Sequence, residues 1–333
     1  MLDAAAPDGP VIDVSGLTVT FRRRDGALSA VNGVDFSLRR GEVLTVLGES
    51  GSGKSVCLKA LMRLLPPYAS IAGRVSVAGK DVLRLPPGEL ADFRGRFLSM
   101  VFQEPMTALD PVYTIGRQIA ETVVQHEGVG YDVANARARE LLERVRIPSA
   151  ARRLRNHPHE LSGGMRQRAM IALALACNPA VLLADEPTTA LDVTVQIQIL
   201  MLLRQLQDEL GMAVVFVTHD VGVAAEIADR IAVMYGGRFV ETGTARQVMR
   251  DPQHPYTQGL LASTVHGGLR GRELVTIPGN PPSLAAIPAG CAFRPRCRHA
   301  HAACEQEPPV VERAPGAAAR CVLLAEAPAP VHA

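Results

Sequence analysis

No apolar run in this 333-residue chain approaches the roughly 20 residues that a membrane-spanning helix needs. The segment Met1–Pro10 is acidic and contains proline, so it does not look like a secretory signal. We therefore expect a cytoplasmic protein that reaches a membrane only through a partner. The chain also has little net charge, +2, from 35 Lys and Arg against 33 Asp and Glu. This balance gives no bulk electrostatic reason to bind nucleic acid, and we expect no nucleic-acid partner.

The six cysteines are unevenly distributed. Cys57 and Cys177 lie inside apolar helical patterns, which predicts buried core thiols. The other four crowd near the C-terminus as Cys291, Cys297, Cys304 and Cys321. Because a cytoplasmic protein rarely keeps structural disulfides, this group suggests a metal site. It contains no C-x-x-C pair, and its spacing leaves both a tetrahedral zinc site and an iron-sulfur cluster open.

Short β-type runs alternate with longer helical ones between Val11 and about Val240. This alternation predicts an α/β domain around a mostly parallel sheet. Composition then shifts to a proline-rich segment, and no internal repeat is found. We predict a disordered N-terminus at residues 1–10, a main domain at 11–250 with a helical insertion at about 112–165, a small C-terminal module at 251–324 and a tail at 325–333.

A glycine-rich loop is the most specific motif of the chain. It consists of Gly48, Glu49, Ser50, Gly51, Ser52, Gly53, Lys54 and Ser55, which fits G-x-x-x-x-G-K-[ST]. A predicted strand at residues 42–47 precedes it and a predicted helix at residues 56–65 follows, as the motif requires. Glycines let backbone N–H groups point at phosphate oxygens, while Lys54 and Ser55 reach the terminal phosphates and Mg²⁺. The loop therefore predicts a nucleotide site.

A second phosphate-binding surface is predicted at Ser162, Gly163 and Gly164, just before a helix that runs through residues 169–176. Ser162 can cap this helix, and the two glycines let another backbone approach closely. Taken alone, however, Ser-Gly-Gly before a helix is a common cap. Its meaning depends on the motif that follows.

Two carboxylates end the apolar strand predicted at residues 181–184. Asp185, at the strand tip, is expected to hold Mg²⁺ through water. Glu186 is expected to polarise an attacking water molecule. Together with the glycine-rich loop, the two carboxylates at the strand tip predict a nucleoside triphosphatase.

In this order the three motifs resemble the Walker A, signature and Walker B motifs of the nucleotide-binding subunit of ABC transporters. The resemblance covers about residues 11–243. It implies the ABC-type P-loop NTPase fold, with a mostly parallel sheet, an antiparallel N-terminal β subdomain and a helical subdomain. It also implies that the chain hydrolyses ATP with Mg²⁺.

The remaining family positions are filled as well. Gln103 matches the Q-loop glutamine, which ligates Mg²⁺ and touches the transmembrane partner, and Asp192 matches the D-loop. His219 matches the switch histidine that contacts the γ-phosphate. Phe21 is the best candidate for the aromatic that stacks on adenine. Gln167 belongs to the signature segment that would face the other subunit.

The resemblance implies two composite sites in a dimer of cassettes. One protomer would supply Lys54, Ser55, Gln103, Asp185, Glu186 and His219, and the other Ser162, Gly163 and Gly164. Because the chain has one cassette, we expect a second ABC ATPase subunit, a sister chain in a heterodimer. We also expect two membrane-spanning permease subunits and a location on the cytoplasmic face of the inner membrane.

Several segments resemble one branch of that family, the ATPase subunits of oligopeptide and dipeptide importers, whose relatives include nickel systems. They are residues 103–111, 157–160, 254–257, 278–282 and 290–297. This resemblance implies peptide import with an extracytoplasmic substrate-binding protein, and nickel or another small solute stays open as cargo. It also implies a 4Fe-4S cluster on the four C-terminal cysteines, with Zn²⁺ as the alternative.

ABC ATPases that do not transport are a further class to weigh, in DNA repair, chromosome structure or translation. The stretch between Ser55 and Leu161 is too short for the long coiled coil of the chromosome class, and it has no heptad run. The translation class carries two cassettes on one chain, whereas this chain has one. A transport ATPase is therefore the function that the sequence predicts.

Overall fold

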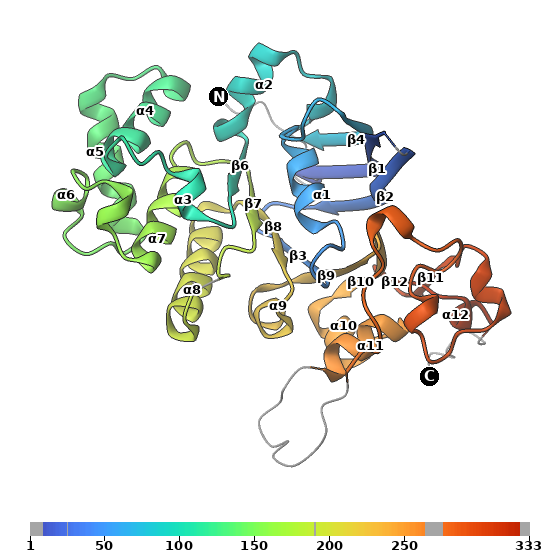
Figure 1. Cartoon of the computed structure of the whole chain (residues 1–333). Coiled ribbons are helices and arrows are strands. Elements are labelled where there is room, and N and C mark those ends of the chain that lie inside the picture. Colours follow the sequence, from blue (N-terminus) through green and yellow to red (C-terminus); the bar gives the residue numbers. More distant parts are fainter. Residues whose placement is uncertain (1–8, 25, 190, 264–275, 327–333) are drawn as a thin grey trace. The chain divides into compact units, whose positions relative to one another are not determined.

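The computed structural model describes residues 9–24, 26–189, 191–263 and 276–326. Most of the N-terminus predicted to be disordered, residues 1–8, and most of the predicted tail, residues 327–333, lie outside these ranges. The chain forms two compact units (Figure 1). Of the described residues, unit 1 comprises 9–13, 37–42, 76–189 and 191–216, and unit 2 comprises 14–24, 26–36, 43–75, 217–263 and 276–326.

Three strands form the sheet of unit 1, in the order β8-β7-β6. They are β6 (Leu98–Val101), β7 (Val181–Asp185) and β8 (Ala213–Thr218, whose last two residues belong to unit 2). β6 and β7 run parallel, with Leu98 opposite Val181. All residues of the three strands are buried, which explains why the apolar run at residues 181–184 predicted β7.

Helices make up most of the remainder of unit 1. They are α2 (Pro87–Arg96), α3 (Pro105–Ala108), α4 (Ile115–Glu127), α5 (Tyr131–Arg144), α6 (Ala150–Arg153), α7 (Gly163–Ala174) and α8 (Val193–Leu210). Short 3₁₀ turns occur at Val82–Arg84 and Pro158–Glu160. Figure 1 shows α4, α5, α6 and α7 gathered into one helical group. Helices α4, α5 and α6 lie within the predicted helical insertion at about 112–165, whereas most of α7 lies beyond it.

Helix α4 illustrates how local sequence sets an element. Thr114 caps its start by accepting the Arg117 N–H. Ile115, Ile119 and Val123 recur every four residues and are all buried, so they form the apolar stripe of an amphipathic helix. Gly128, with φ of +68°, ends it in the left-handed conformation that glycine adopts without strain.

Unit 2 contains most of the strands. Strands β2 (Gly26–Leu38), β1 (Ile12–Arg23) and β4 (Ala69–Val77) are neighbours in that order. A larger sheet has the order β11-β12-β10-β9-β3, formed by β11 (Val310–Ala314), β12 (Ala317–Arg320), β10 (Arg238–Thr244), β9 (Arg230–Tyr235) and β3 (Val43–Leu47). The two-residue strand β5 (Lys80–Asp81) belongs to unit 1, where it pairs antiparallel with Ser76 and Val77, the last two residues of β4.

The larger sheet of unit 2 is less parallel than the sequence predicts. β3 and β9 pair in parallel, but β9 with β10, β10 with β12, and β11 with β12 pair antiparallel. The C-terminal hairpin β11–β12 causes much of this difference, because it adds to the sheet beside β10, with Glu241 opposite Ala319. Residues near the C-terminus therefore continue a sheet that begins with β3.

The helices of unit 2 are α1 (Lys54–Leu61), α9 (Val221–Ile227), α10 (Ala245–Arg250), α11 (Pro255–Ala262) and α12 (Val322–Glu326). Three 3₁₀ turns, Leu284–Ala286, Arg294–Arg296 and Ala302–Glu305, lie in the C-terminal segment. One hydrophobic cluster joins this segment to the rest of the unit, with Phe293 packed among Tyr235, Tyr256 and Leu260. Residues 276–326 thus share a core with β9, β10 and α11.

Candidate functional site

The glycine loop of unit 2 connects the buried strand β3 to helix α1. Two of its glycines leave no room for a side chain. A Cβ at Gly48 would lie 2.3 Å from the carbonyl oxygen of Met234, and a Cβ at Gly53 would lie 2.5 Å from that of Ala30. Gly53 also has a φ of +107°, which residues with side chains rarely adopt. The tight curl that a phosphate needs is therefore fixed by the backbone around the loop.

Lys54 lies at the centre of this curl. Its side chain is buried, and its Nζ donates hydrogen bonds to the carbonyl oxygens of Gly48, at 2.7 Å, and Glu49, at 2.9 Å. Ser55 is half-buried in the first turn of α1, so its hydroxyl lies beside the N-terminus of that helix. Backbone N–H groups, an ammonium group and a helix N-terminus together form a site for anionic oxygens.

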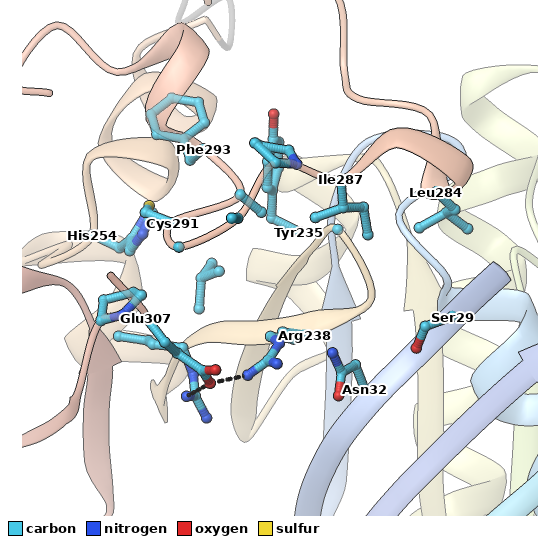
Figure 2. Close-up of a pocket in the computed structure, with 18 of the residues that line it drawn as sticks. Ser29, Asn32, Tyr235, Arg238, His254, Leu284, Ile287, Cys291, Phe293 and Glu307 are labelled. Carbon is cyan, nitrogen blue, oxygen red and sulfur yellow. Dashed lines mark hydrogen bonds and ion pairs between the residues drawn. The ribbon is translucent and has the colours of Figure 1, made fainter. Parts of the chain in front are cut away.

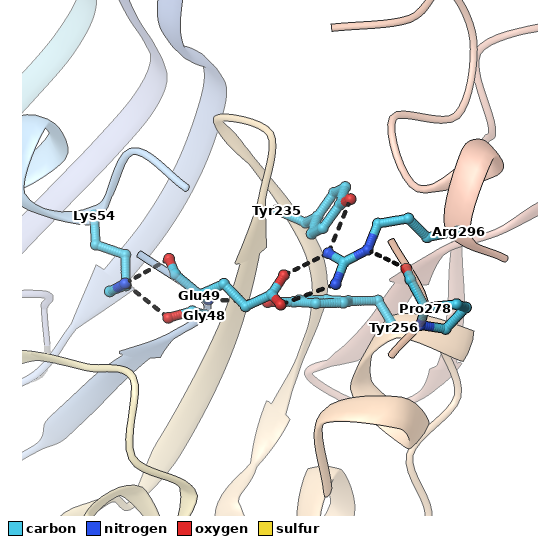
Figure 3. A network of polar contacts seen from close by, with 7 residues as sticks. All are labelled: Gly48, Glu49, Lys54, Tyr235, Tyr256, Pro278 and Arg296. Atoms are coloured by element: carbon cyan, nitrogen blue, oxygen red, sulfur yellow. Dashed lines mark hydrogen bonds and ion pairs between the residues drawn. The ribbon is translucent and has the colours of Figure 1, made fainter. Parts of the chain in front are cut away.

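Glu49 behaves differently from its neighbours in the loop. It is among the predicted ATP-binding residues, but the structure engages its carboxylate with Arg296 from the 3₁₀ turn Arg294–Arg296 (Figure 3). Nothing in the local sequence signals this contact, because the two residues are 247 positions apart. The sequence analysis missed Arg296 for that reason.

The other predicted ATP contacts of unit 2 lie on strand ends and edges. His219 is exposed and follows β8, after Thr218, whose hydroxyl accepts the Asp220 N–H at 3.0 Å. Phe21 is half-buried on β1, and its ring centroid lies 6.0 Å from that of Tyr68. Tyr68 is 60% exposed, so two aromatic rings rather than one are available for a base at this position. The sequence analysis did not single out Tyr68.

In unit 1 the Walker B carboxylates end β7. Asp185 is buried as the last strand residue, whereas Glu186 is only half-buried. Glu186 has a φ of +45°, a left-handed conformation that is strained for a residue with a side chain. Its carboxylate accepts the Thr189 hydroxyl at 2.9 Å. This strained turn directs a carboxylate out of the strand, as a group that acts on a bound reactant requires.

The signature segment begins α7 of unit 1. Ser162 caps the helix by accepting the Met165 N–H at 3.4 Å, and both Ser162 and Gly163 are exposed. A Cβ at Gly164 would lie 2.8 Å from Cγ1 of Val195, so glycine is needed where α7 meets α8. The exposed Gly163 lies at a helix N-terminus, where N–H groups are suited to bind an anionic ligand.

Two further predicted residues of unit 1 have contrasting positions. Asp192 is exposed and caps α8, where it accepts the Val195 N–H at 3.0 Å. Gln167 is only 2% exposed, so it lies inside the unit rather than on the surface with Ser162. The structure therefore brings the start of the signature to the surface and leaves Gln167 in the interior.

Comparison with known proteins identifies the family. Residues 31–189 match the ABC transporter family, and residues 240–304 match the C-terminal region of oligopeptide/dipeptide transporters. The chain is 46% identical over 318 residues to the oligopeptide transport ATP-binding protein OppD of Salmonella typhimurium, covering 96% of this chain and 95% of that relative. It is 50% identical over 327 residues to a putative peptide import ATP-binding protein of Brucella melitensis, covering 94% and 97%.

A solved structure supports the same assignment. It is a dimeric ATP-binding cassette in a post-hydrolysis state bound to ADP and Pi. Its TM-score is 0.63 at 31% identity, over 71% of this chain and 99% of that chain. This chain belongs to the ATP-binding subunits of ABC transporters, in the oligopeptide/dipeptide branch. As an ABC ATPase it hydrolyses ATP, and the predicted α/β P-loop fold is confirmed.

This ABC ATPase has no described helix with the length and hydropathy that a bilayer crossing requires. Gln103 is exposed after β6, at the position that the Q-loop prediction gives it. Apolar side chains follow it at the surface of unit 1: Met106 is 45% exposed, Val112 72% and Tyr113 38%.

The four C-terminal cysteines of the ABC ATPase all line one small pocket of unit 2, together with His254 and Phe293. Burial raises the pKa of the Cys291, Cys297 and Cys321 thiols. The thiols therefore share one environment. Within the described ranges, however, no three His, Cys, Asp or Glu side chains are arranged to hold a metal ion, so the geometry does not support the predicted metal site.

The two remaining cysteines differ from each other. Cys57 is 2% exposed in α1, and burial raises its pKa to about 12, which confirms the predicted core thiol. Cys177 lies beyond the end of α7 and is only half-buried, with Sγ 3.9 Å from the Thr122 carbonyl oxygen. The prediction of a helical core position for Cys177 was wrong, because α7 ends at Ala174.

A larger cavity of about 380 Å³ lies in unit 2, between residues of β2, the β9–β10 turn and the C-terminal segment (Figure 2). Glu307 lines it and pairs with two guanidinium groups, those of Arg238 and Arg320. Arg238 belongs to β10 and Arg320 to β12, so one carboxylate bridges two neighbouring strands. The ion pair between Glu307 and Arg238 therefore links the C-terminal segment to β10.

Proposed function

We propose that this chain is an ATPase subunit of an importer for oligopeptides or dipeptides, bound to the cytoplasmic face of the membrane through its permease. The observation that carries this proposal is the near full-length similarity, 46% and 50% identical, to proteins described as oligopeptide transport and putative peptide import ATP-binding proteins. The match of residues 240–304 to the C-terminal region of such transporters supports the same cargo class.

We assign the ATP chemistry to the predicted motif residues. Lys54 and the loop N–H groups would bind the phosphates, and His219 would contact the γ-phosphate. Ser55, Gln103 and Asp185 offer hydroxyl, amide and carboxylate oxygens, the hard ligands that Mg²⁺ prefers. Mg²⁺ would neutralise charge on the phosphates. Glu186, whose turn projects its carboxylate beyond β7, would orient and deprotonate the attacking water.

A second cassette would complete the site. The exposed Ser162 and Gly163 of this chain are suited to bind a γ-phosphate held by a partner subunit, and Asp192 would contribute to the same interface. ATP would then stabilise the closed dimer, and loss of the γ-phosphate would loosen it. Because the chain carries one cassette, we infer that it pairs with a second ATPase subunit, a sister chain or, as the alternative, a second copy of this chain.

We place the permease contact at Gln103 and the exposed Met106, Val112 and Tyr113. These residues lie in unit 1 and follow β6. A permease helix in this place would sense the Q-loop and transmit its movement. An extracytoplasmic binding protein would select the peptide before the permease.

We further propose a 4Fe-4S cluster on Cys291, Cys297, Cys304 and Cys321, with Zn²⁺ as the alternative. Its support is that all four thiols line one pocket, and thiolates are the soft ligands that both groups prefer. When bound, the group would cross-link a segment that has few helices and strands of its own. Anaerobic purification followed by absorption spectroscopy and metal analysis distinguishes the two groups. Brown protein with about four irons supports the cluster. Colourless protein with one zinc refutes the cluster and supports the alternative.

Uptake of labelled di- and oligopeptides by membrane vesicles, after co-expression with the permease subunits of an oligopeptide importer, tests the transport function. Wild-type chain should drive ATP-dependent peptide uptake and Glu186→Gln should not. Uptake of nickel instead of peptide would overturn the cargo. Binding to DNA or ribosomes, with no membrane partner recovered, would overturn the transport function.

A further inference from the structure

Arg296 is an unusual residue for a C-terminal segment, because its guanidinium group is buried and its donors are engaged with groups of unit 2 (Figure 3). Its Nη1 and Nη2 donate to the two carboxylate oxygens of Glu49, at 2.7 and 3.0 Å. Its Nε donates to the Pro278 carbonyl oxygen at 2.9 Å, and Nη1 also lies 3.4 Å from the Tyr235 hydroxyl. A two-point contact of this kind fixes the orientation of the carboxylate as well as its position.

Burial makes this contact energetically important. The Arg296 side chain is 5% exposed and that of Glu49 25% exposed, so water screens the pair little. Removal of Glu49 would leave the Arg296 charge buried without compensation, which is far more costly than loss of an exposed ion pair.

Glu49 is held from its backbone as well. Its N–H donates to the Tyr256 hydroxyl at 2.9 Å. Tyr256 is fully buried and packs against Tyr235, with ring centroids 4.5 Å apart. The peptide group before Glu49 is therefore attached to the aromatic core of unit 2, while its carboxylate is attached to Arg296.

The same peptide region carries the carbonyl groups that hold Lys54. Lys54 Nζ donates to the carbonyl oxygens of Gly48 and Glu49, the residues on either side of the peptide that Tyr256 binds. Gly48 also packs closely against β9, because a Cβ there would lie 2.3 Å from the Met234 carbonyl oxygen. A continuous series of hydrogen bonds thus runs from Arg296 through Glu49 to the ammonium group.

We propose that Arg296 is a positioning residue of the ATP site, which sets the affinity for MgATP by fixing the first turn of the glycine loop through Glu49. The C-terminal segment is then part of the nucleotide site and not only an attachment to it. Without Arg296, Glu49 would turn toward water, and the loop would have to be ordered at the moment ATP binds. The expected effect is therefore on affinity more than on turnover. This inference rests on ATP binding at the loop and not on the peptide cargo.

The test is the equilibrium affinity of the full chain for MgATP, measured by displacement of a fluorescent ATP analogue. Wild-type protein is measured first, because failure of wild-type binding would overturn the proposed ATP site rather than this inference. Arg296→Met should weaken MgATP binding by about tenfold or more, the size of one lost charge-assisted contact. The MgATP affinity of Arg296→Lys should lie between those of Arg296→Met and the wild type, since an ammonium restores the charge but not the two-point geometry.

Arg294 provides a matched control in the same 3₁₀ turn. It pairs with Glu305 at 3.2 Å, and both side chains are more exposed than that of Arg296. Arg294→Met should leave the MgATP affinity within about twofold of wild type. An equal loss of affinity from Arg294→Met would overturn the proposal, because it would reduce the effect to general weakening of the segment.

Glu49→Gln tests the same contact from its other partner and can be used if Arg296→Met does not fold. It retains two polar atoms opposite Arg296 but removes the charge, so it should also raise the dissociation constant for MgATP. In the double variant Glu49→Gln with Arg296→Lys, the losses should be less than additive, as expected for one shared contact. Unchanged affinity in the single variants, with a lowered melting temperature alone, would refute the positioning role.

Discussion

The buried His254 predicts how the stability of the folded protein depends on pH. Its side chain is 1% exposed and caps α11, where Nδ1 accepts the Tyr256 N–H at 3.0 Å. The backbone N–H of His254 donates to the Glu241 carboxylate at 2.9 Å. Burial lowers the pKa of His254 to about 4, because the charged ring would lose its hydration. The imidazole is therefore neutral in the folded protein at neutral pH.

The sign of the pH dependence follows from this depressed pKa. Between the unfolded value of about 6.5 and the folded value of about 4, the unfolded chain binds the proton more tightly, so acid favours unfolding. The stability that His254 contributes is present above pH 6.5 and is lost as the pH falls toward 4. The loss is about 2 kcal/mol at pH 5, and about 3 kcal/mol in the limit.

Glu241 faces His254 and acts in the opposite direction. Burial raises its pKa, so its protonation in the folded protein offsets part of the acid effect. The effect of His254 can be separated from that of Glu241 by a variant that changes His254 alone. His254→Asn is suitable, because asparagine can accept the Tyr256 N–H as a helix cap but does not titrate.

The assay is thermal unfolding of wild type and His254→Asn between pH 7.5 and pH 5. The variant starts less stable because it leaves part of the ring volume unfilled. Its melting temperature should fall less steeply with acid, so that the gap to wild type changes by about 3 to 4 °C between pH 7.5 and pH 5. His159→Asn, at an exposed position, should run parallel to wild type. Parallel curves for His254→Asn as well would refute the reasoning.

Four further outcomes follow from the site. Glu186→Gln should bind ATP but lose about 100-fold or more in turnover, by single-turnover assay; full residual activity would exclude it as general base. Lys54→Ala should weaken ATP binding by about tenfold or more and abolish the nucleotide-stabilised dimer in size-exclusion chromatography. Gly53→Ala should lose nucleotide binding altogether, since its Cβ would lie 2.5 Å from the Ala30 carbonyl oxygen. Cys57, with a pKa of about 12, should resist iodoacetamide at pH 8 until the protein unfolds, by mass spectrometry.

Strands and helices with a strong local signal could be predicted closely. The strand predicted at residues 42–47 is β3, Val43–Leu47, and the strand predicted at residues 181–184 is β7, Val181–Asp185. The helix predicted at residues 56–65 is displaced: α1 runs from Lys54 to Leu61. Gly53 ends the loop one residue before Lys54, and Arg63, with φ of +51°, cannot continue a helix. Helix ends depend on single backbone conformations, which an apolar pattern does not encode.

The sequence by itself determined the family and the order of the phosphate-binding motifs, because each motif is a contiguous run whose residue types follow from the chemistry of its ligand. Tertiary structure alone decided that Gln167 is interior, that Cys177 lies beyond α7 and that the C-terminal hairpin extends a sheet beside β10. It also decided that Arg296 meets Glu49 across 247 residues. The physical reason is that a local pattern records which face of a helix or strand is apolar, whereas a buried ion pair depends on where two distant segments pack.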